Sequence, residues 1–109
     1  MQKSKEEFKK FKTTGQTVYL AQAGEKLWNA FNILIELKLK RKTKSFADLK
    51  KATGILYQKT WDTLWLDTFQ HAYDLHRFFY RGWTDDEDEI VHLFQNTYTR
   101  LLVLEKMKV

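Results

Sequence analysis

Apolar residues recur at helical spacing along most of this 109-residue chain, with charged residues between them. Apolar side chains three and four positions apart line one side of an α-helix, so the pattern is that of amphipathic helices. It predicts helices over 4–13, 17–41, 45–52 and 55–80, and a last helix that follows Thr84 and ends near Lys106. The chain has no proline and only four glycines, too few turn residues for a β-rich fold. We therefore predict an all-α fold, an up-down bundle of four to five helices in one domain covering 1–109.

Capping signals set the predicted boundaries of these helices. Ser4 with Glu7, and Thr84 with Glu87, have the spacing of a capping box, in which the hydroxyl caps the helix and the carboxylate reaches back. Gly15 follows the first helix, as a C-terminal cap would. The pair 53–54, Thr-Gly, predicts a break between the short helix opened by Ser45 and the long helix after it.

Two helices carry clear core stripes. In the second helix the stripe contains Gly24, where a bare backbone would let another helix approach closely, while Glu25, Asn29 and Glu36 lie opposite. The predicted stripe of the second helix is Leu20, Ala23, Gly24, Leu27, Trp28, Phe31, Leu34 and Ile35. The inward side of the last helix is predicted to be Ile90, Val91, Leu93, Phe94, Thr97, Tyr98, Leu101, Leu102 and Leu104.

His76 places an ionisable ring inside an apolar stripe. The stripe consists of Trp61, Trp65, Phe69, Ala72, His76 and Phe79. Burying such a ring without a partner costs about 1–3 kcal/mol. His76 is therefore either a core histidine with a hydrogen-bonded ring or part of a functional site. Tyr73, Arg77 and Tyr80 are close enough in sequence to line a polar recess around it.

Charge is distributed unevenly along the chain. Residues 1–60 contain 14 Lys and Arg against 5 Asp and Glu, whereas residues 61–109 contain 5 against 9. A basic half can contact phosphates, and it can equally pair with the acidic half of its own chain or of a second copy. The densest basic cluster is Lys38, Lys40, Arg41, Lys42 and Lys44. With Phe46, the stretch 38–51 either tracks phosphates and stacks a base or forms a solvated corner between two helices.

Several functional classes have no motif here. The chain has no cysteine, which excludes disulfides and thiolate metal sites, and no glycine-rich phosphate loop. Asp67, His71 and Asp74 share a helix face that could hold a divalent ion, or they form an ordinary solvated face; we predict no metal site and no cofactor. The charged N-terminus and the absence of a long apolar run predict a cytoplasmic protein that does not cross a membrane.

Two segments together resemble the archaeal PaREP family of HEPN-like helical bundles. They are AQAGEKLWNA at 21–30 and LHRFFYRG at 75–82, followed by an acidic-capped helix, and the likeness extends over 4–106. The resemblance implies a four- to five-helix bundle that dimerises through its long helices. Many HEPN domains are metal-independent ribonucleases, and they often pair with small nucleotidyltransferase proteins.

The HEPN signature is an Arg, four to six residues, then a His, in a cleft at the dimer interface. The His performs acid–base chemistry on the ribose 2′-hydroxyl and the Arg stabilises phosphate charge. If His76 is that His, the Arg positions hold Phe69, Gln70 and His71, so the signature is incomplete. His71 binds phosphate only when protonated, and Arg77 or Arg81 would have to supply the charge from another position.

The sequence therefore favours an HEPN-like module, non-catalytic or weakly catalytic, that binds RNA, a nucleotide or a protein partner as a homodimer. The alternatives are a metal-independent endoribonuclease and a basic helical nucleic-acid-binding protein acting through 38–51. The candidate catalytic residues are His76, Arg77 and Arg81. The candidate binding residues are His71, Tyr73, Tyr80, Lys38, Lys40, Arg41, Lys42 and Lys44.

Overall fold

The computed structural model describes residues 1–81 and 86–109. This part of the chain contains no strand, and its helices are α1 (Gln2–Thr14), α2 (Thr17–Leu39), α3 (Phe46–Thr60), α4 (Leu64–Arg81) and α5 (Glu87–Lys106). The predicted all-α bundle is therefore confirmed. None of the described helices is long and apolar enough to cross a membrane. The predicted helix end at Gly82 and the predicted cap Thr84 lie outside the described residues.

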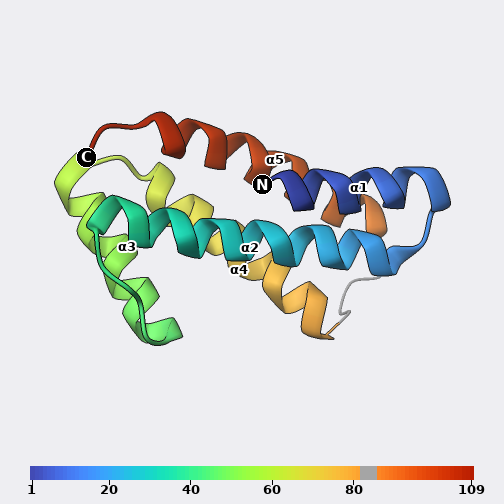
Figure 1. Cartoon of the computed structure of the whole chain (residues 1–109), viewed down its shortest axis with the longest axis horizontal. Coiled ribbons are helices and arrows are strands. Elements are labelled where there is room, and N and C mark those ends of the chain that lie inside the picture. The colour runs from blue at the N-terminus through green and yellow to red at the C-terminus, as the bar shows by residue number, and fades with distance from the viewer. Residues whose placement is uncertain (82–85) are drawn as a thin grey trace.

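Helix α2 is the central element and contacts each of the other four helices. Helices α1, α2, α4 and α5 alternate in direction, and α3 extends from one end of the bundle, where it packs on α4 and α2 (Figure 1). Helix α5 therefore runs parallel to α2. Hydrogen bonds join the two helices at both ends: Thr17 donates to Glu87 over 2.5 Å, and Lys38 Nζ donates to the carbonyls of Glu105 and Met107 over 3.0 and 2.7 Å.

The core is built on the predicted stripe of α2. All eight of its predicted positions are buried. The close approach predicted at Gly24 is also present, because a Cβ at this position would lie 3.2 Å from both Cβ and Cδ2 of Leu75 in α4. In α5, Leu102 corrects the prediction: it is exposed, because it lies one residue, and so about 100° around the helix, from the buried Leu101.

The first and last helices begin differently from the prediction. Helix α1 starts at Gln2 with Met1 as its N-cap, so the capping box at Ser4 is wrong. Ser4 is buried inside the first turn, where its hydroxyl donates to the Met1 carbonyl over 2.6 Å. The predicted cap Gly15 is confirmed, with φ of 71°. Helix α5 is capped by Asp86, whose carboxylate accepts a hydrogen bond from the Asp88 amide.

The predicted break at Thr53-Gly54 is wrong, because α3 continues through both residues to Thr60. Thr53 is buried and satisfies its hydroxyl within the helix by donating to the Leu49 carbonyl over 2.9 Å. A glycine ends a helix when it adopts the left-handed conformation, whereas inside a helix it only lowers stability by about 1 kcal/mol. Apolar burial on both sides of Gly54 can offset that loss.

The break lies instead at 61–63, between α3 and α4. Trp61 takes the left-handed conformation with φ of 56°, and its amide donates to the Tyr57 carbonyl over 2.6 Å. The Asp62 carboxylate then accepts a hydrogen bond from the Leu64 amide and so starts α4. Trp61 is consequently 75% exposed and does not belong to the apolar stripe of α4, which corrects the prediction that it did.

Substitutions at the two helical glycines, Gly24 and Gly54, are expected to change the free energy of unfolding in opposite directions. We expect Gly54→Ala to raise the free energy of unfolding by about 0.5–1 kcal/mol, because the position is helical and nothing lies within 4 Å of the added Cβ. We expect Gly24→Val to lower it by about 1–3 kcal/mol, because the larger side chain would overlap Leu75. Urea unfolding monitored by circular dichroism measures both. A destabilised Gly54→Ala variant would contradict the continuous α3.

Candidate functional site

The ring of His76 is paired with a carboxylate from another helix. His76 on α4 places Nδ1 3.1 Å and 2.8 Å from Oε1 and Oε2 of Glu25 on α2. The two side chains are only partly accessible, with 28% of His76 and 14% of Glu25 exposed. The pair lies beside the Gly24–Leu75 contact, because Glu25 follows Gly24 and His76 follows Leu75 in the chain. Glu25, predicted to lie on the side of α2 opposite the core, is instead only 14% exposed and contacts His76 of α4.

The electrostatics of Glu25 reflect both burial and its partner. Burial raises the pKa of the Glu25 carboxyl above its ordinary value, and the hydrogen bond from His76 opposes that rise. As an acceptor, the ionised carboxylate holds the imidazole with the proton on Nδ1. Nε2 is then the ring nitrogen that Glu25 leaves for another partner. A carboxylate that fixes the tautomer and orientation of a partly exposed histidine is an arrangement used in acid–base catalysis.

Aromatic rings surround this pair. Trp28 of α2 stacks on the His76 ring with centroids 5.0 Å apart, and Tyr80 meets it edge-on at 4.8 Å. Tyr73 lies 6.2 Å from His76 and 4.8 Å from Phe46, the first residue of α3. We call Phe46, Tyr73, His76 and Tyr80 the aromatic row; its two ends, Phe46 and Tyr80, are 45% and 69% exposed. Buried Trp28 supports the row from α2.

The arginines proposed to act with His76 have separate positions. Arg77 lies over the Tyr73 ring, with its guanidinium carbon 5.9 Å from the centroid, and Arg81 is exposed at the end of α4. Among residues 1–81 and 86–109, neither arginine has a hydrogen bond or a cation–π contact with the His76 ring. Phe79, predicted to share the apolar stripe with His76, is partly exposed and contacts Tyr80 instead.

His71 contacts a different helix from His76. It accepts a hydrogen bond from Arg100 of α5, whose Nη1 contacts Nδ1 of the ring. Burial lowers the pKa of His71, Arg100 lowers it further, and Asp74 and Asp67 act in the opposite direction. The lowered pKa disfavours the charged form of the His71 ring, which is the form that would attract a phosphate. Asp74 accepts a hydrogen bond from Gln70 over 3.1 Å.

A metal centre finds no support in the described residues. Across 1–81 and 86–109, no group of three or more histidine, aspartate or glutamate side chains is placed to hold an ion. His71, the residue that the sequence places between Asp67 and Asp74 on one helix face, is turned to Arg100.

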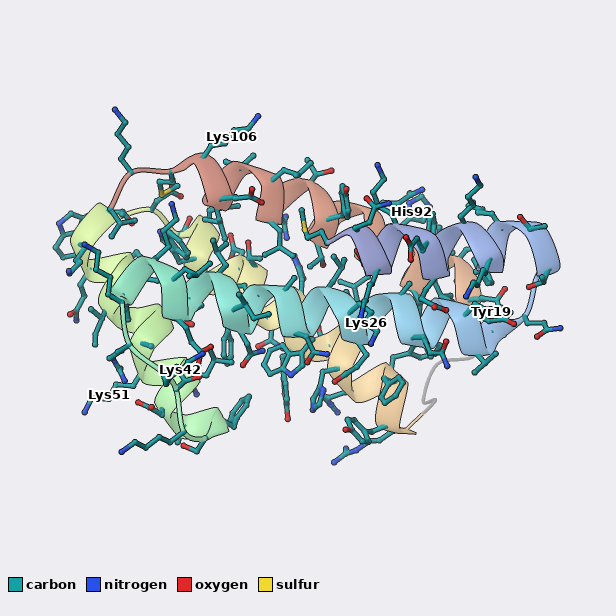
Figure 2. All side chains as sticks on the ribbon, in the orientation of Figure 1. Tyr19, Lys26, Lys42, Lys51, His92 and Lys106 are labelled. Carbon is teal, nitrogen blue, oxygen red and sulfur yellow. The ribbon has the colours of Figure 1, made fainter. Side chains whose placement is uncertain are left out.

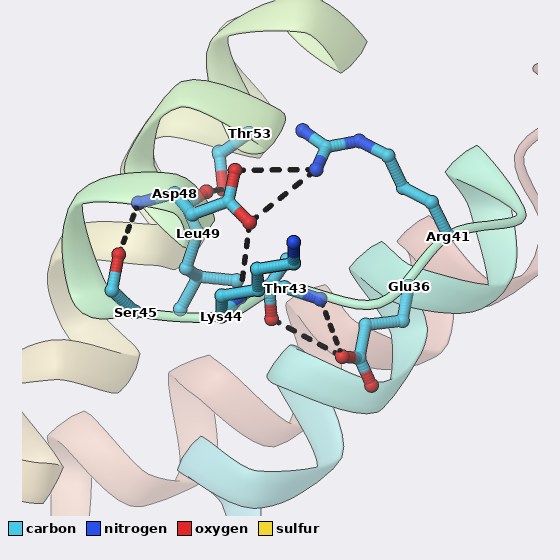
Figure 3. Close-up of polar contacts among 8 residues, drawn as sticks. All are labelled: Glu36, Arg41, Thr43, Lys44, Ser45, Asp48, Leu49 and Thr53. Atoms are coloured by element: carbon cyan, nitrogen blue, oxygen red, sulfur yellow. Dashed lines mark hydrogen bonds and ion pairs between the residues drawn. The ribbon is translucent and has the colours of Figure 1, made fainter.

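The basic cluster splits into structural and exposed cations. Lys38 holds the end of α5, and Arg41 Nη1 lies 3.2 Å from Oδ1 of Asp48, the carboxylate that also accepts the Lys44 amide (Figure 3). The Thr43 amide and hydroxyl both donate to Glu36, which fixes the loop between α2 and α3. The side chains of Lys40, Lys42 and Lys44 remain exposed.

Among the described residues, the ion pairs of lysine and arginine side chains join residues of the basic half of the chain, 1–60. Arg41 pairs with Asp48, Lys42 lies 3.9 Å from Glu36, and Lys10 lies 3.4 Å from Glu7. All lysine and arginine side chains of residues 1–60 except Lys38 are exposed, and Lys26, Lys42 and Lys51 among them are labelled in Figure 2.

Comparison with protein-family models, with curated proteins and with solved structures found no match to this chain. Over residues 1–81 and 86–109, the class that the structure defines is a compact all-α domain of five helices. The finer assignment, to the HEPN-like bundles, remains a prediction that depends on the resemblance of 21–30 and 75–82.

Sequence reasoning identified His76, Tyr73 and Tyr80 as one neighbourhood, and the structure brings them together. It missed Glu25 and Trp28 as members of that neighbourhood, although both belong to the EKLW segment on which the resemblance depends. It linked Phe46 to the basic cluster, whereas the Phe46 ring packs on Tyr73.

The lowered pKa of His71 predicts a loss of stability in acid. A histidine in the unfolded chain takes up a proton as the pH falls through its ordinary pKa of 6.5, whereas folded His71 resists protonation. Proton binding therefore stabilises the unfolded state relative to the folded state, and the free energy of unfolding decreases. The stability is complete above pH 6.5 and declines as the pH falls from there toward the folded pKa. We expect His71→Gln to reduce this decline, measured by urea unfolding between pH 7.5 and pH 5.

His92 provides the matched control, because it is an exposed histidine on α5 (Figure 2). His92→Gln should leave the pH profile of stability unchanged. If His71→Gln and wild type lose stability in parallel, the burial of a neutral His71 against Arg100 is not the cause.

Proposed function

We propose that this protein is an HEPN-like helical module that binds single-stranded RNA as a homodimer through the aromatic row. The observation that carries the proposal is a histidine fixed by a partly buried carboxylate within a row of partly exposed aromatic rings. The assignment to HEPN-like bundles comes from the resemblance at 21–30 and 75–82. The incomplete Arg-His signature favours binding without catalysis, or with weak catalysis.

The chemistry of the aromatic row suits single-stranded nucleic acid. Each base has a flat π-face that stacks on an aromatic side chain, and stacking of this kind contributes about 1–3 kcal/mol per base. Arg77 and Arg81 of α4 directly follow His76 and Tyr80 in the chain, and Lys26 of α2 follows Glu25, the partner of His76. These side chains supply positive charge for the phosphates. A duplex would hide the base faces, so an unpaired strand fits better.

An exposed apolar strip on α2 supports the homodimer. Ile33 and Leu37 are both exposed, and with Ala30 they lie at helical spacing on one side of the helix. Ile33 is five residues beyond Trp28, about 140° around the helix, so the strip faces away from the aromatic row. Two copies that pair through this strip would bury it and leave both rows accessible.

Binding is tested with fluorescently labelled, unstructured RNA in fluorescence anisotropy. We expect Tyr80→Ala to raise Kd by about fivefold or more, because an exposed ring of the row is removed. Trp61→Ala is the control, since Trp61 is a more exposed aromatic ring at a distant turn. Light scattering on the same samples should give a mass near twice 13.2 kDa.

Equal affinity in the Tyr80→Ala and wild-type proteins would contradict binding through the row, and no RNA binding by the wild type would contradict the function. A mass of 13.2 kDa at every concentration would contradict the homodimer.

One further observation favours a second candidate, a metal-independent endoribonuclease. Glu25 contacts Nδ1 of His76, which leaves Nε2 as the nitrogen that would exchange a proton with a ribose 2′-hydroxyl. Arg77 or Arg81 would have to approach the phosphate, from this chain or from a second copy. The exposed lysines of 38–51 suit non-specific phosphate contacts, but Lys38 and Arg41 already hold the fold.

If the protein is a nuclease, it should cleave single-stranded RNA in the presence of EDTA. His76→Ala should then lower the cleavage rate by about 100-fold or more, and Glu25→Gln should lower it too, because the ring loses its fixed orientation. His92→Ala should cleave normally. Cleavage that persists in folded His76→Ala would contradict this candidate, and so would the absence of cleavage by the wild type.

A further inference from the structure

A cavity of about 420 Å³ lies between α3 and α4, beside the aromatic row. Its walls include Phe46, Lys50 and Thr53 of α3 and Phe69, Gln70 and Tyr73 of α4. The volume falls in the range of small-molecule sites, which is about 300–1,000 Å³. Phe46 and Tyr73 belong both to the cavity and to the row, so the two surfaces are continuous.

The cavity has the surfaces that a nucleobase needs. The ring of Phe46 lies 5.6 Å from that of Phe69 and 4.8 Å from that of Tyr73, and the Phe69 ring lies 6.4 Å from the Tyr73 ring. These three rings and Leu66 form the apolar part of the lining. Gln70 donates its amide N–H to Asp74, which orients the side chain and leaves its carbonyl oxygen as an acceptor for the N–H groups of a base edge.

Charge at the cavity favours an anionic ligand. Lys50 is exposed and, within the described chain, takes part in no ion pair. None of the residues that line the cavity is acidic. Among the described residues, the one carboxylate that contacts a lining side chain, that of Asp74, accepts the hydrogen bond from Gln70. A base in the cavity would place its phosphate on the surface, where the Lys50 ammonium is available.

We propose that this cavity is a nucleobase subsite, which takes one unpaired base of an RNA strand lying along the aromatic row. The base packs against Phe46, Phe69 and Tyr73, Gln70 contacts its edge, and Lys50 neutralises its phosphate. This inference rests on the proposed function, and it adds a specific base-binding position to a surface that otherwise stacks bases without regard to their identity.

Neighbouring lysines on α3 give a matched test that leaves the core intact. Lys50 lines the cavity, whereas Lys51, which is also exposed, is not among its lining residues. With labelled decauridylate and decaadenylate as probes, we expect Lys50→Ala to raise Kd severalfold and to lower the slope of log Kd against log salt by about one. Lys51→Ala should change both quantities less. Phe46→Ala, checked for folding by circular dichroism, should raise Kd by about fivefold or more.

A cross-link gives a second readout that does not depend on any variant being folded. RNA containing one 4-thiouridine, irradiated with the wild-type protein, should cross-link to Phe46, Phe69 or Tyr73, as mapped by mass spectrometry. The subsite would be overturned by two results together. The first is an equal change in Kd for Lys50→Ala and Lys51→Ala, and the second is cross-linking only at Tyr80 or outside the row.

These outcomes separate the two proposals. RNA binding that depends on Tyr80 but not on Lys50 or Phe46 overturns the subsite and leaves the proposed function in place. No RNA binding by the wild type overturns both. If a mononucleotide displaced the labelled RNA as effectively as an unlabelled decanucleotide, the cavity would not be part of a continuous strand-binding surface, and the proposed subsite would also be overturned.

Discussion

The close approach of α2 and α4 at Gly24 and Leu75 determines most of what is distinctive in this fold. Gly24 has no side chain, so the Leu75 side chain packs directly against the backbone of α2. The residues that follow these two in the chain, Glu25 and His76, are thereby brought within 2.8 Å of each other. A larger residue at position 24 would move α4 outward and separate the pair.

The same contact explains how an ionisable pair is tolerated beside the core. Glu25 loses part of its hydration, which raises its pKa, and the Nδ1–H of His76 replaces some of the lost hydrogen bonding. Trp28 covers the pair from within α2 and also contacts Phe46, Phe69 and Tyr73. One tryptophan therefore connects three helices, and it holds the rings of the row in fixed positions before any ligand arrives. Such preorganisation reduces the entropy lost on binding.

The error in the predicted helix boundaries has a local physical explanation. Thr53-Gly54 resembles a helix end because both residues have low helix propensity. The neighbours Leu49, Ala52 and Leu56 are buried on one side of α3, so ending the helix there would expose apolar surface. At 61–63 a turn is possible because Asp62 caps the next helix and Trp61 can leave the core. The predicted break followed from the low helix propensity of Thr53 and Gly54, whereas the observed break lies where no buried apolar residue of α3 would be exposed.

The sequence by itself determined the all-α class, the core stripe of α2 and the anomaly of His76, because each follows from spacing along a single helix. It also placed Tyr73 and Tyr80 near His76, since they lie within one turn of the same helix. Only the tertiary structure decided that Glu25, 51 residues earlier in the chain, is the partner of His76, and that Phe46 extends the row from α3. Periodicity fixes which residues share a face of one helix, but the pairing of two faces depends on how the helices pack.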